Sequence, residues 1–563
     1  MKAERTATSL LRRKALLGVA AWCFAGYAQA NPTNPTVISG AATFAASGKS
    51  LNVTNTPGTI INWQGFSVKA DELTRFIQQN AQSAVLNRVT SQEQSAILGQ
   101  LLSNGRGYLI NPNGITIGAG ARIDTAGFAA SSLSLSDSDA LAGKFKLQDT
   151  GSSGKVVNNG TITTANGGFV YLVAPNVENN GIITSPKGEI ILAAGKSVEL
   201  VDSQKPELRV LLTAPENTAV NVGKLIAEAG SVGIFAGVIK QRGLISANSV
   251  VVGENGKIML KAKKDITLEA GSKTEASGPQ GGEITIQSDG GAATVAGVVE
   301  AIGTQGKGGA INVTAPVAVT IEPTARVSAN GTEGGSVTLT SSVGSVTVSA
   351  PVTVNATAGV AGQIAVNAAT AAALNAGQLS ASGALGGGRV SIRGAGGVTL
   401  DVASSAQASG ASGGTVSIAS DQGALVSQGT IDVSGTDGAG GKVQLTALSD
   451  ITIDIASKIL ASGRSGGEVY IESREGTLLS SGLIDGQGSD GQGGRVLLLA
   501  PRVGLIREAV VNVSGRTGGG TVLVGGDFQG KNSDIQNALR TYVGNAVAIR
   551  ADAVDSGDGG KII

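Results

Sequence analysis

The chain has 563 residues, of which 85 are Gly and none is His, and its 42 Lys and Arg nearly balance its 41 Asp and Glu. Without histidine, neither a Ser-His-Asp triad nor an imidazole ligand for zinc, iron or copper can form. The near-zero net charge and the small aromatic content (nine Phe, five Tyr, two Trp) argue against nucleic-acid binding, which needs a basic surface and stacking platforms.

Residues 1–30 have the layout of a secretory signal peptide. A basic segment over residues 1–14 precedes an apolar run over residues 15–27, and Ala28-Gln29-Ala30 has the small-x-small pattern of a cleavage site. The apolar run is shorter than the ~20 residues that a spanning helix needs. We therefore expect cleavage between Ala30 and Asn31 and no transmembrane segment in the mature chain. The only cysteine lies in the part removed.

Residues 31–275 contain a series of short motifs in a fixed order. They are Asn87-Arg88-Val89, Leu98-Gly99, Ser103-Asn104-Gly105, Ile110-Asn111-Pro112-Asn113-Gly114 and Gly127-Phe128-Ala129-Ala130-Ser131. As a set, these motifs closely resemble the secretion domain of the filamentous haemagglutinin family, the exported partner in two-partner secretion. The second motif of the haemagglutinin branch, Asn-Pro-Asn-Leu, is absent, so the sequence is more similar to the adhesin branch.

The resemblance implies a β-helix and an export route. The secretion domain would meet an outer-membrane TpsB-type transporter through its periplasmic docking domains, and the chain would thread out and fold outside. The family's recognition residues match at Asn87, Arg88, Asn111, Pro112, Asn113 and Gly114.

Two interpretations of these recognition residues remain open. Asn-Pro-Asn-Gly is a strong turn sequence by itself, because Pro fixes φ and Gly takes the left-handed position. The motif could therefore shape a corner of the first coils or contact the transporter directly. For Asn87 and Arg88, a buried or capping structural role is favoured over direct contact.

Residues 69–102 have a helix-forming composition, with Leu73, Phe76 and Ile77 at helical spacing. Taken alone, this segment predicts a helical hairpin. The family resemblance instead implies strands around residues 75–78 and 84–89, with at most a short turn near Ser95. We follow the resemblance.

Residues 276–563 repeat with a period of 26 to 27 residues. A Gly-Gly pair, one variable residue and an apolar-x-apolar triplet recur ten times between Gly282 and Gly520, once with Ala in place of the first Gly. The unit after Gly335 contains three short alternating runs, each with the period of a strand that has one buried face. Three strands per repeat predict an all-β, right-handed parallel β-helix. Its corner glycines would supply positive φ or allow close backbone approach.

No catalytic, cofactor-binding or metal-ligating residues are predicted. A polar column before the corner glycines includes Asp432 and Asp485, but Leu460 lies between them, and the two carboxylates would be roughly 10 Å apart on a flat solvated face. A glycosidase needs two carboxylates that flank a cleft. The Gly-Ser-Asp-Gly and Gly-Thr-Asp-Gly turns at residues 488–491 and 435–438 resemble calcium-binding turns, but they do not recur every nine residues, so plain turns are expected.

Near the end of the chain the interval between Gly520 and Gly560 is 40 residues, which predicts an excursion from the rod near residues 527–545. The last residues open a new coil. Because an uncapped stack exposes an apolar column and unpaired strand edges, we expect the β-helical stalk to continue beyond Ile563. The alternative is a complete short protein whose end is covered by a partner.

These features predict a secreted or surface-exposed adhesin-type exoprotein that uses no cofactor. It would reach the cell surface of a Gram-negative bacterium through the periplasm and outer membrane, and its surface receptor is not identified by the sequence. Two alternatives are a β-helical polysaccharide-acting enzyme and the N-terminal part of a contact-dependent toxin.

Overall fold

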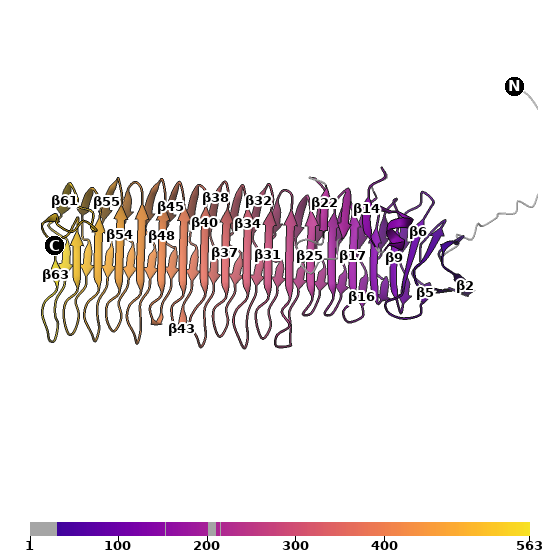
Figure 1. Ribbon diagram of the computed structural model, residues 1–563, viewed down its shortest axis with the longest axis horizontal. Coiled ribbons are helices and arrows are strands. Elements are labelled where there is room, and N and C mark those ends of the chain that lie inside the picture. Colours follow the sequence, from indigo (N-terminus) through magenta and orange to yellow (C-terminus); the bar gives the residue numbers. More distant parts are fainter. Residues whose placement is uncertain (1–30, 143, 152–153, 201–209, 214–215) are drawn as a thin grey trace, which may run out of the picture.

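The computed structural model describes residues 31–142, 144–151, 154–200, 210–213 and 216–563, so the expected signal peptide lies outside the described residues. The chain winds into a long rod of stacked coils (Figure 1). Successive coils contribute strands to three long sheets that run along the rod. The predicted parallel β-helix with three strands per coil is therefore confirmed.

One coil of the repeat illustrates the geometry. It consists of β37 (Ser336–Ser341), β38 (Ser345–Val348) and β39 (Pro351–Thr353), which belong to what we call the first, second and third sheets. Strand β37 pairs in parallel with β34 (Ala310–Ala315) one coil earlier and with β40 (Gln363–Ala368) one coil later. Each strand thus finds its backbone partners in the neighbouring coils.

The core is a column of aliphatic side chains inside the three sheets. Ile311, Val337 and Ile364 stand opposite one another in three successive first-sheet strands, and at most 1% of each is exposed. Burying such a side chain contributes roughly 1.5–3 kcal/mol. The alternation of buried and partly exposed residues along each strand explains the period of two in the sequence.

The paired glycines are required by close approach between coils. A Cβ on Gly335 would lie 2.2 Å from the carbonyl oxygen of Gly309, and a Cβ on Gly362 would lie 1.9 Å from that of Gly335. None of these three glycines has positive φ. Of the two reasons that the sequence offers for these corner glycines, steric contact with the preceding coil is therefore the one that applies.

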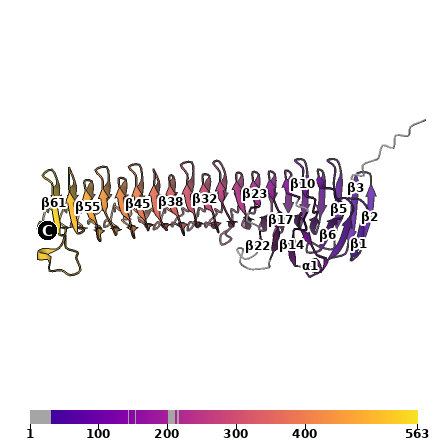
Figure 2. The ribbon, with the colours of Figure 1, turned by 90° about the horizontal axis from the view of Figure 1, so that it is seen from above.

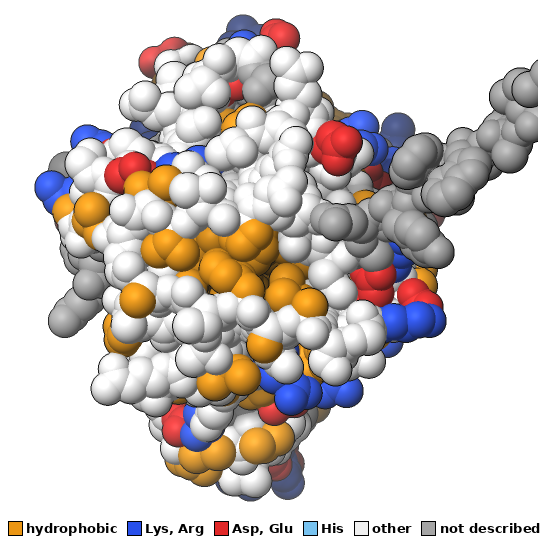
Figure 3. All heavy atoms as spheres, turned by 90° about the vertical axis from the view of Figure 1, so that its right-hand side faces the viewer, with side chains coloured by type: hydrophobic (Ala, Val, Ile, Leu, Met, Phe, Trp, Pro, Cys, Tyr) orange, Lys and Arg blue, Asp and Glu red, His pale blue; other side chains and the backbone are white. Residues whose placement is uncertain are grey.

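Antiparallel strands form the N-terminal end of the rod. Strand β1 (Thr36–Ser39) is antiparallel to β4 (Thr59–Trp63), and β2 (Ala42–Ser47) forms a hairpin with β3 (Ser50–Asn55). Figure 3 looks onto this end and shows hydrophobic side chains gathered at its centre. This antiparallel cap was not anticipated from the sequence.

A small antiparallel sheet lies against the outer surface of the first sheet, and we call it the cover. It consists of β13 (Ser134–Leu135), β14 (Phe145–Gln148), β21 (Ser197–Leu200) and β22 (Val210–Thr213), with the short helix α1 (Asp137–Leu141) beside it (Figure 2). The cover buries a second apolar core on the outside of the rod, formed by Ile60, Leu86, Tyr108, Ile110, Leu133, Leu135, Leu147, Val173, Ile191, Ala193, Val198, Val210 and Phe235.

Residues 69–102 form strands, as the resemblance implies. They are β5 (Leu73–Ile77), β6 (Ala84–Val89), β7 (Ser95–Ile97) and the start of β8 (Gln100–Ser103). In agreement with at most a short turn near Ser95, residues 91–94 form a short loop, and Ser95 itself begins β7 and is fully buried. Parallel pairing of β7 with β10 (Ile115–Ile117) supplies backbone partners that local composition does not reveal.

The predicted excursion is real, but its boundaries differ. Residues 525–539 leave the rod between β60 (Thr521–Val524) and β61 (Arg540–Val543), and β61 pairs in parallel with β58 (Arg502–Leu505). The second part of the predicted range therefore belongs to the rod. The excursion projects near the C-terminal end in Figure 2, and its Ile535 packs on outward-facing Leu497, Leu499 and Leu523. No helix among the described residues is long and apolar enough to cross a membrane.

Candidate functional site

The structure brings together, in two adjacent coils, the residues that match the family's recognition motifs. Asn87 and Arg88 lie in β6, which pairs in parallel with β9 (Arg106–Ile110). Arg88 stands opposite Ile110, and the Asn111–Gly114 turn follows directly after Ile110. Because successive residues of a strand point to opposite faces, Asn87 faces the interior of the rod and Arg88 faces the cover.

Asn87 is buried, with 3% of the residue exposed. Its Oδ1 accepts a hydrogen bond from Trp63 Nε1 at 2.9 Å, and its Nδ2 donates to the carbonyl of Tyr108 at 3.3 Å. Trp63 meets Phe44 and Phe66 edge to face, with ring centroids 5.5 and 5.6 Å apart. Asn87 therefore satisfies the indole N–H inside the aromatic core of the first coils, where an unpaired donor would be costly.

Arg88 attaches the cover to the rod. One guanidinium nitrogen, Nη2, donates to the carbonyl of Leu135 at 2.8 Å and to the carboxylate of Asp137 at 2.7 Å, while Nη1 donates to Asn62 Oδ1 at 3.4 Å. Leu135 ends β13 and Asp137 begins α1. Only 20% of the Arg88 side chain is exposed. Because the Arg88 guanidinium is partly buried, its hydrogen bonds to the cover are stronger than those of an ion pair on the open surface.

The Asn111–Gly114 segment is a tight turn with its polar atoms occupied. The Gly114 N–H donates to the Asn111 carbonyl at 2.9 Å, and Gly114 has φ +106°, a conformation that favours glycine. The Asn111 side chain is fully buried and donates to the Glu93 carbonyl and to Ser95 Oγ, both at 2.9 Å.

Asn113 completes this turn. Its Nδ2 donates to the Ser91 carbonyl at 2.8 Å, and its backbone N–H donates to Asn111 Oδ1 at 3.0 Å. The turn is thereby bonded to the loop after β6, which belongs to the preceding coil. Asn31, on the mature side of the expected cleavage point, is bonded to the first coils through Lys49 and Thr74.

A cavity of about 310 Å³ lies between the first sheet and the cover, next to this motif cluster. Its walls are mostly apolar and include Leu86, Tyr108, Leu141 and Phe145. Burial raises the pKa of the Tyr108 hydroxyl to about 12. Since the phenol stays protonated at neutral pH and no carboxylate lines the cavity, the site offers no general base.

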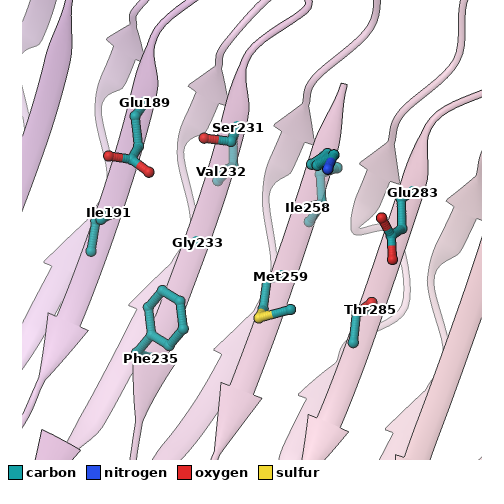
Figure 4. Close-up of a pocket in the computed structure, with 11 residues that line it drawn as sticks. Glu189, Ile191, Ser231, Val232, Gly233, Phe235, Ile258, Met259, Glu283 and Thr285 are labelled. Carbon is teal, nitrogen blue, oxygen red and sulfur yellow. The ribbon is translucent and has the colours of Figure 1, made fainter. Parts of the chain in front are cut away.

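A second, smaller cavity of about 40 Å³ lies on the outer surface of the first sheet (Figure 4). It crosses β20 (Glu189–Ala194), β25 (Ser231–Ala236) and β28 (Lys257–Ala262), where Phe235 and Met259 line it beside Gly233. A Cβ on Gly233 would lie 2.5 Å from the Phe235 ring, so glycine leaves room for that ring. The space is close to the size of a water molecule rather than a substrate.

The carboxylates of the polar column do not form a catalytic pair. Asp432 and Asp485 end third-sheet strands two coils apart and are half-buried, which corrects the expectation of a flat solvated face. Each accepts a hydrogen bond from the backbone of the loop that follows it, through the N–H groups of Ser434 and Gln487. Burial raises the pKa of Asp485. Among the described residues, no three His, Cys, Asp or Glu side chains are placed to hold a metal ion.

The Gly-Ser-Asp-Gly turn has an ion-pair partner on each side. Asp490 lies 3.2 Å from Arg464 of the preceding coil and 3.0 Å from Arg516 of the following one. The carboxylate that could have suited calcium is thus neutralised by two guanidinium groups of neighbouring loops.

A buried amide ladder was missed in the sequence. Asn158, Asn179, Asn221 and Gln241 occupy equivalent second-sheet positions in four successive coils and are 0% exposed. Each Nδ2 donates to the next side-chain carbonyl at 2.8 Å, and Gln241 Nε2 completes the ladder on the Gly243 and Lys273 carbonyls. The available signal was a recurrence of Asn or Gln two residues before Gly.

Comparison with known proteins shows what the N-terminal half of the chain is similar to. The family model described as the TPS secretion domain matches residues 28–286. A heme/hemopexin-binding protein of Haemophilus influenzae strain Rd is 33% identical over 178 residues, covering 26% of this chain and 20% of that protein. A second heme/hemopexin-binding protein of Haemophilus influenzae is 39% identical over 75 residues, covering 13% of this chain and 8% of that protein. The matches thus span a fifth or less of these relatives.

Among solved structures, the secretion domain of HMW1 from Haemophilus influenzae is similar at 28% sequence identity. The alignment covers 77% of this chain and 99% of that domain, with a TM-score of 0.44.

Proposed function

Because this chain belongs to the two-partner secretion family of exoproteins, we propose that an outer-membrane TpsB-type transporter exports it by recognising residues 31–275 through periplasmic docking domains. Residues 276–563 would form the stalk carried outside. The observation that carries this proposal is the cluster formed by Asn87, Arg88 and the Asn111–Gly114 turn, which occupies two adjacent coils of the matched domain.

The recognition residues would serve export by shaping the first coils. This role is supported by their contacts, since Asn87, Arg88, Asn111 and Asn113 all direct their polar groups to partners within the chain. A direct contact with the transporter would have to replace these hydrogen bonds.

Outside the cell, the protein would act as a non-enzymatic adhesin whose receptor binds the flank of the rod. A long surface built from repeated coils supports this role, as does the placement of Asp432 and Asp485 two coils apart. The heme or hemopexin binding of the two relatives is not carried over, because the alignments cover a fifth or less of them.

Export can be tested by expressing the full chain with and without a TpsB-type outer-membrane transporter. The protein should appear in the medium or on the cell surface only when the transporter is present, and deletion of residues 31–275 should leave it inside. Equal export without the transporter would contradict the route. Attachment of the same cells to host cells then tests the adhesin role separately.

The indirect role of the motif is tested by comparing folding with export in the variants N87A, R88Q and N111A. Each should lose export in proportion to its loss of stability, measured on purified protein by Trp63 fluorescence. A variant that keeps the stability of the parent and still fails to be exported would instead indicate direct recognition.

A further inference from the structure

A long groove runs along the stalk beside the first sheet. It has a volume of about 690 Å³ and extends over five coils, from Gly413 to Thr521. Its lining consists of the paired glycines of each coil, the first residue of each first-sheet strand and Gln492, next to the row of loops seen in Figure 1. The volume falls within the usual range of ligand sites, but the shape is extended along the rod and suits a linear polymer.

A row of cations at every second coil runs along the strand side of this groove, with Lys442 and Arg495 in its lining and Arg389 and Lys561 one coil beyond its two ends. Arg389, Lys442, Arg495 and Lys561 are the first residues of their first-sheet strands and are exposed. The register places one coil between successive cations, occupied by Thr415, Glu468 and Thr521. With strands ~4.8 Å apart, the cations recur about every 10 Å.

Two of these cations are available to a ligand. Among the described residues, neither Arg389 nor Arg495 has an ion-pair partner, whereas Lys442 pairs with Glu468 at 3.1 Å and Lys561 lies 3.6 Å from Asp527. Glu468 is the single carboxylate of the row. A row with four cations and one anion favours an anionic ligand that follows the rod axis.

The glycines of the groove can supply hydrogen-bond acceptors. Gly440, Gly466 and Gly493 line the groove, and among the described residues their carbonyls accept none of the backbone hydrogen bonds outside the strand ladders. Side chains cannot fill the floor, because a Cβ on Gly467 would lie 2.2 Å from the Gly441 carbonyl oxygen. A ligand rich in hydroxyl donors can satisfy these carbonyls.

We propose that this groove binds a linear acidic polysaccharide, laid along the rod with one carboxylate per disaccharide facing the cations. An extended disaccharide has a length similar to two coils, so each repeat of the polymer would meet one cation. Sugar hydroxyls would donate to the glycine carbonyls. This inference rests on the proposed adhesin function and names the chemical class of its receptor.

Hyaluronan, which has one carboxylate per disaccharide, is the probe, and binding is measured by calorimetry on the purified full-length protein. The double variant R389Q/R495Q should bind about tenfold more weakly, since two charge-assisted contacts are lost. E468Q should bind more tightly than the parent because it removes the only anion of the row. Neutral dextran should not bind.

The matched control is R393Q/R502Q, which removes two arginines from the same two coils. Arg393 pairs with Asp421 and Arg502 donates to Thr477, so both are already engaged away from the groove. This variant should bind as the parent does.

Three results would overturn the proposal: no binding of hyaluronan, equal loss in both double variants, or equally tight binding of poly-glutamate. The last would mean that any polyanion suffices. Failure of the adhesin function is separable, because it would leave hyaluronan binding intact while cells with and without the protein attach equally to host cells.

Discussion

At the scale of single residues, buried polar groups of the first coils are tolerated because each has a defined partner. Asn87 bonds the indole of Trp63, and Asn111 bonds the loop of the preceding coil. Removing one partner leaves the other buried and unsatisfied, which costs more than the net value of the hydrogen bond. Substitutions at such positions should therefore destabilise the protein more than the small size of the side chains suggests.

Replacing Asn87 by Ala should lower the free energy of unfolding by about 2–3 kcal/mol, because the Trp63 indole and the Tyr108 carbonyl both lose a buried partner. Urea unfolding followed by Trp63 fluorescence measures this, since the other tryptophan, Trp22, lies in the expected signal peptide. The control is Q79A at an exposed position. Equal stability of N87A and Q79A would contradict the assignment.

Replacing Asp485 by Asn should stabilise the protein at neutral pH and not at pH 3. Burial raises the pKa of this carboxyl, so its contribution to stability is fully present below the pKa of the unfolded chain and is lost as the pH rises through the raised folded value. The gain at pH 7 should be below ~1 kcal/mol, because the group is partly solvated. Thermal unfolding at both pH values tests this, and a destabilised D485N at pH 7 would be the opposite outcome.

At the scale of elements, one inward position of the second sheet changes in character along the rod. Four successive coils carry the amide ladder there, whereas Ile117 precedes it and Leu268, Val295 and Ile321 follow it. A fully satisfied ladder fixes the register between coils, since a shift by two residues, which keeps the same face inward, would place the apolar Val177 against Asn158. In the stalk, the close contacts of the paired glycines take over this role of fixing the register between coils.

Asn179→Leu should destabilise the secretion domain by about 2–4 kcal/mol, because Asn158 loses its acceptor and Asn221 its donor inside the core. Hydrogen exchange of the flanking strands should increase with it. The neighbouring Asn180 is exposed, so N180A should change stability by less than ~0.5 kcal/mol. Similar effects of the two substitutions would contradict a role for the ladder.

Gly441→Ala should break the contact between two stalk coils, since its Cβ would lie 2.2 Å from the Gly414 carbonyl oxygen. We expect a loss of more than ~2 kcal/mol, as for other overpacked sites. Gly559→Ala is the matched control, because a Cβ there meets nothing within 4 Å. Circular dichroism during heating measures the thermal stability of both variants. A G441A variant as stable as the parent would refute the steric explanation.

The strands of the stalk could be predicted from the sequence because each is determined locally, by alternating apolar residues between glycines that recur in every coil. The cover could not, because its partners are distant in sequence: Arg88 meets Asp137, and β14 pairs with β21. The cap was missed although its β2–β3 hairpin is local, and the amide ladder was missed although Asn or Gln recurs two residues before Gly. The family resemblance singled out Asn87, Arg88 and residues 111–114, but their contacts could be described only from the three-dimensional arrangement.

At the scale of the whole molecule, the rod is nearly one-dimensional, since each coil contacts mainly the coils before and after it. Stability in such proteins is a sum of terms within coils and between neighbours. A local defect should therefore open the rod where it occurs and leave distant coils folded. The aromatic core around Trp63 and the stalk are far apart along the rod, so the unfolding of each region can be measured separately.

Val366→Asp places a carboxylate in the column of the stalk, at a position that is 0% exposed. Burying an unpaired charge there should unfold the surrounding coils, so limited proteolysis should cut within one or two coils of residue 366 while Trp63 fluorescence stays native. The control is T338D, because Thr338 points outward on an adjacent first-sheet strand. Simultaneous loss of the Trp63 signal and of the stalk would show that the rod unfolds as one cooperative unit, and the nearest-neighbour description would then fail.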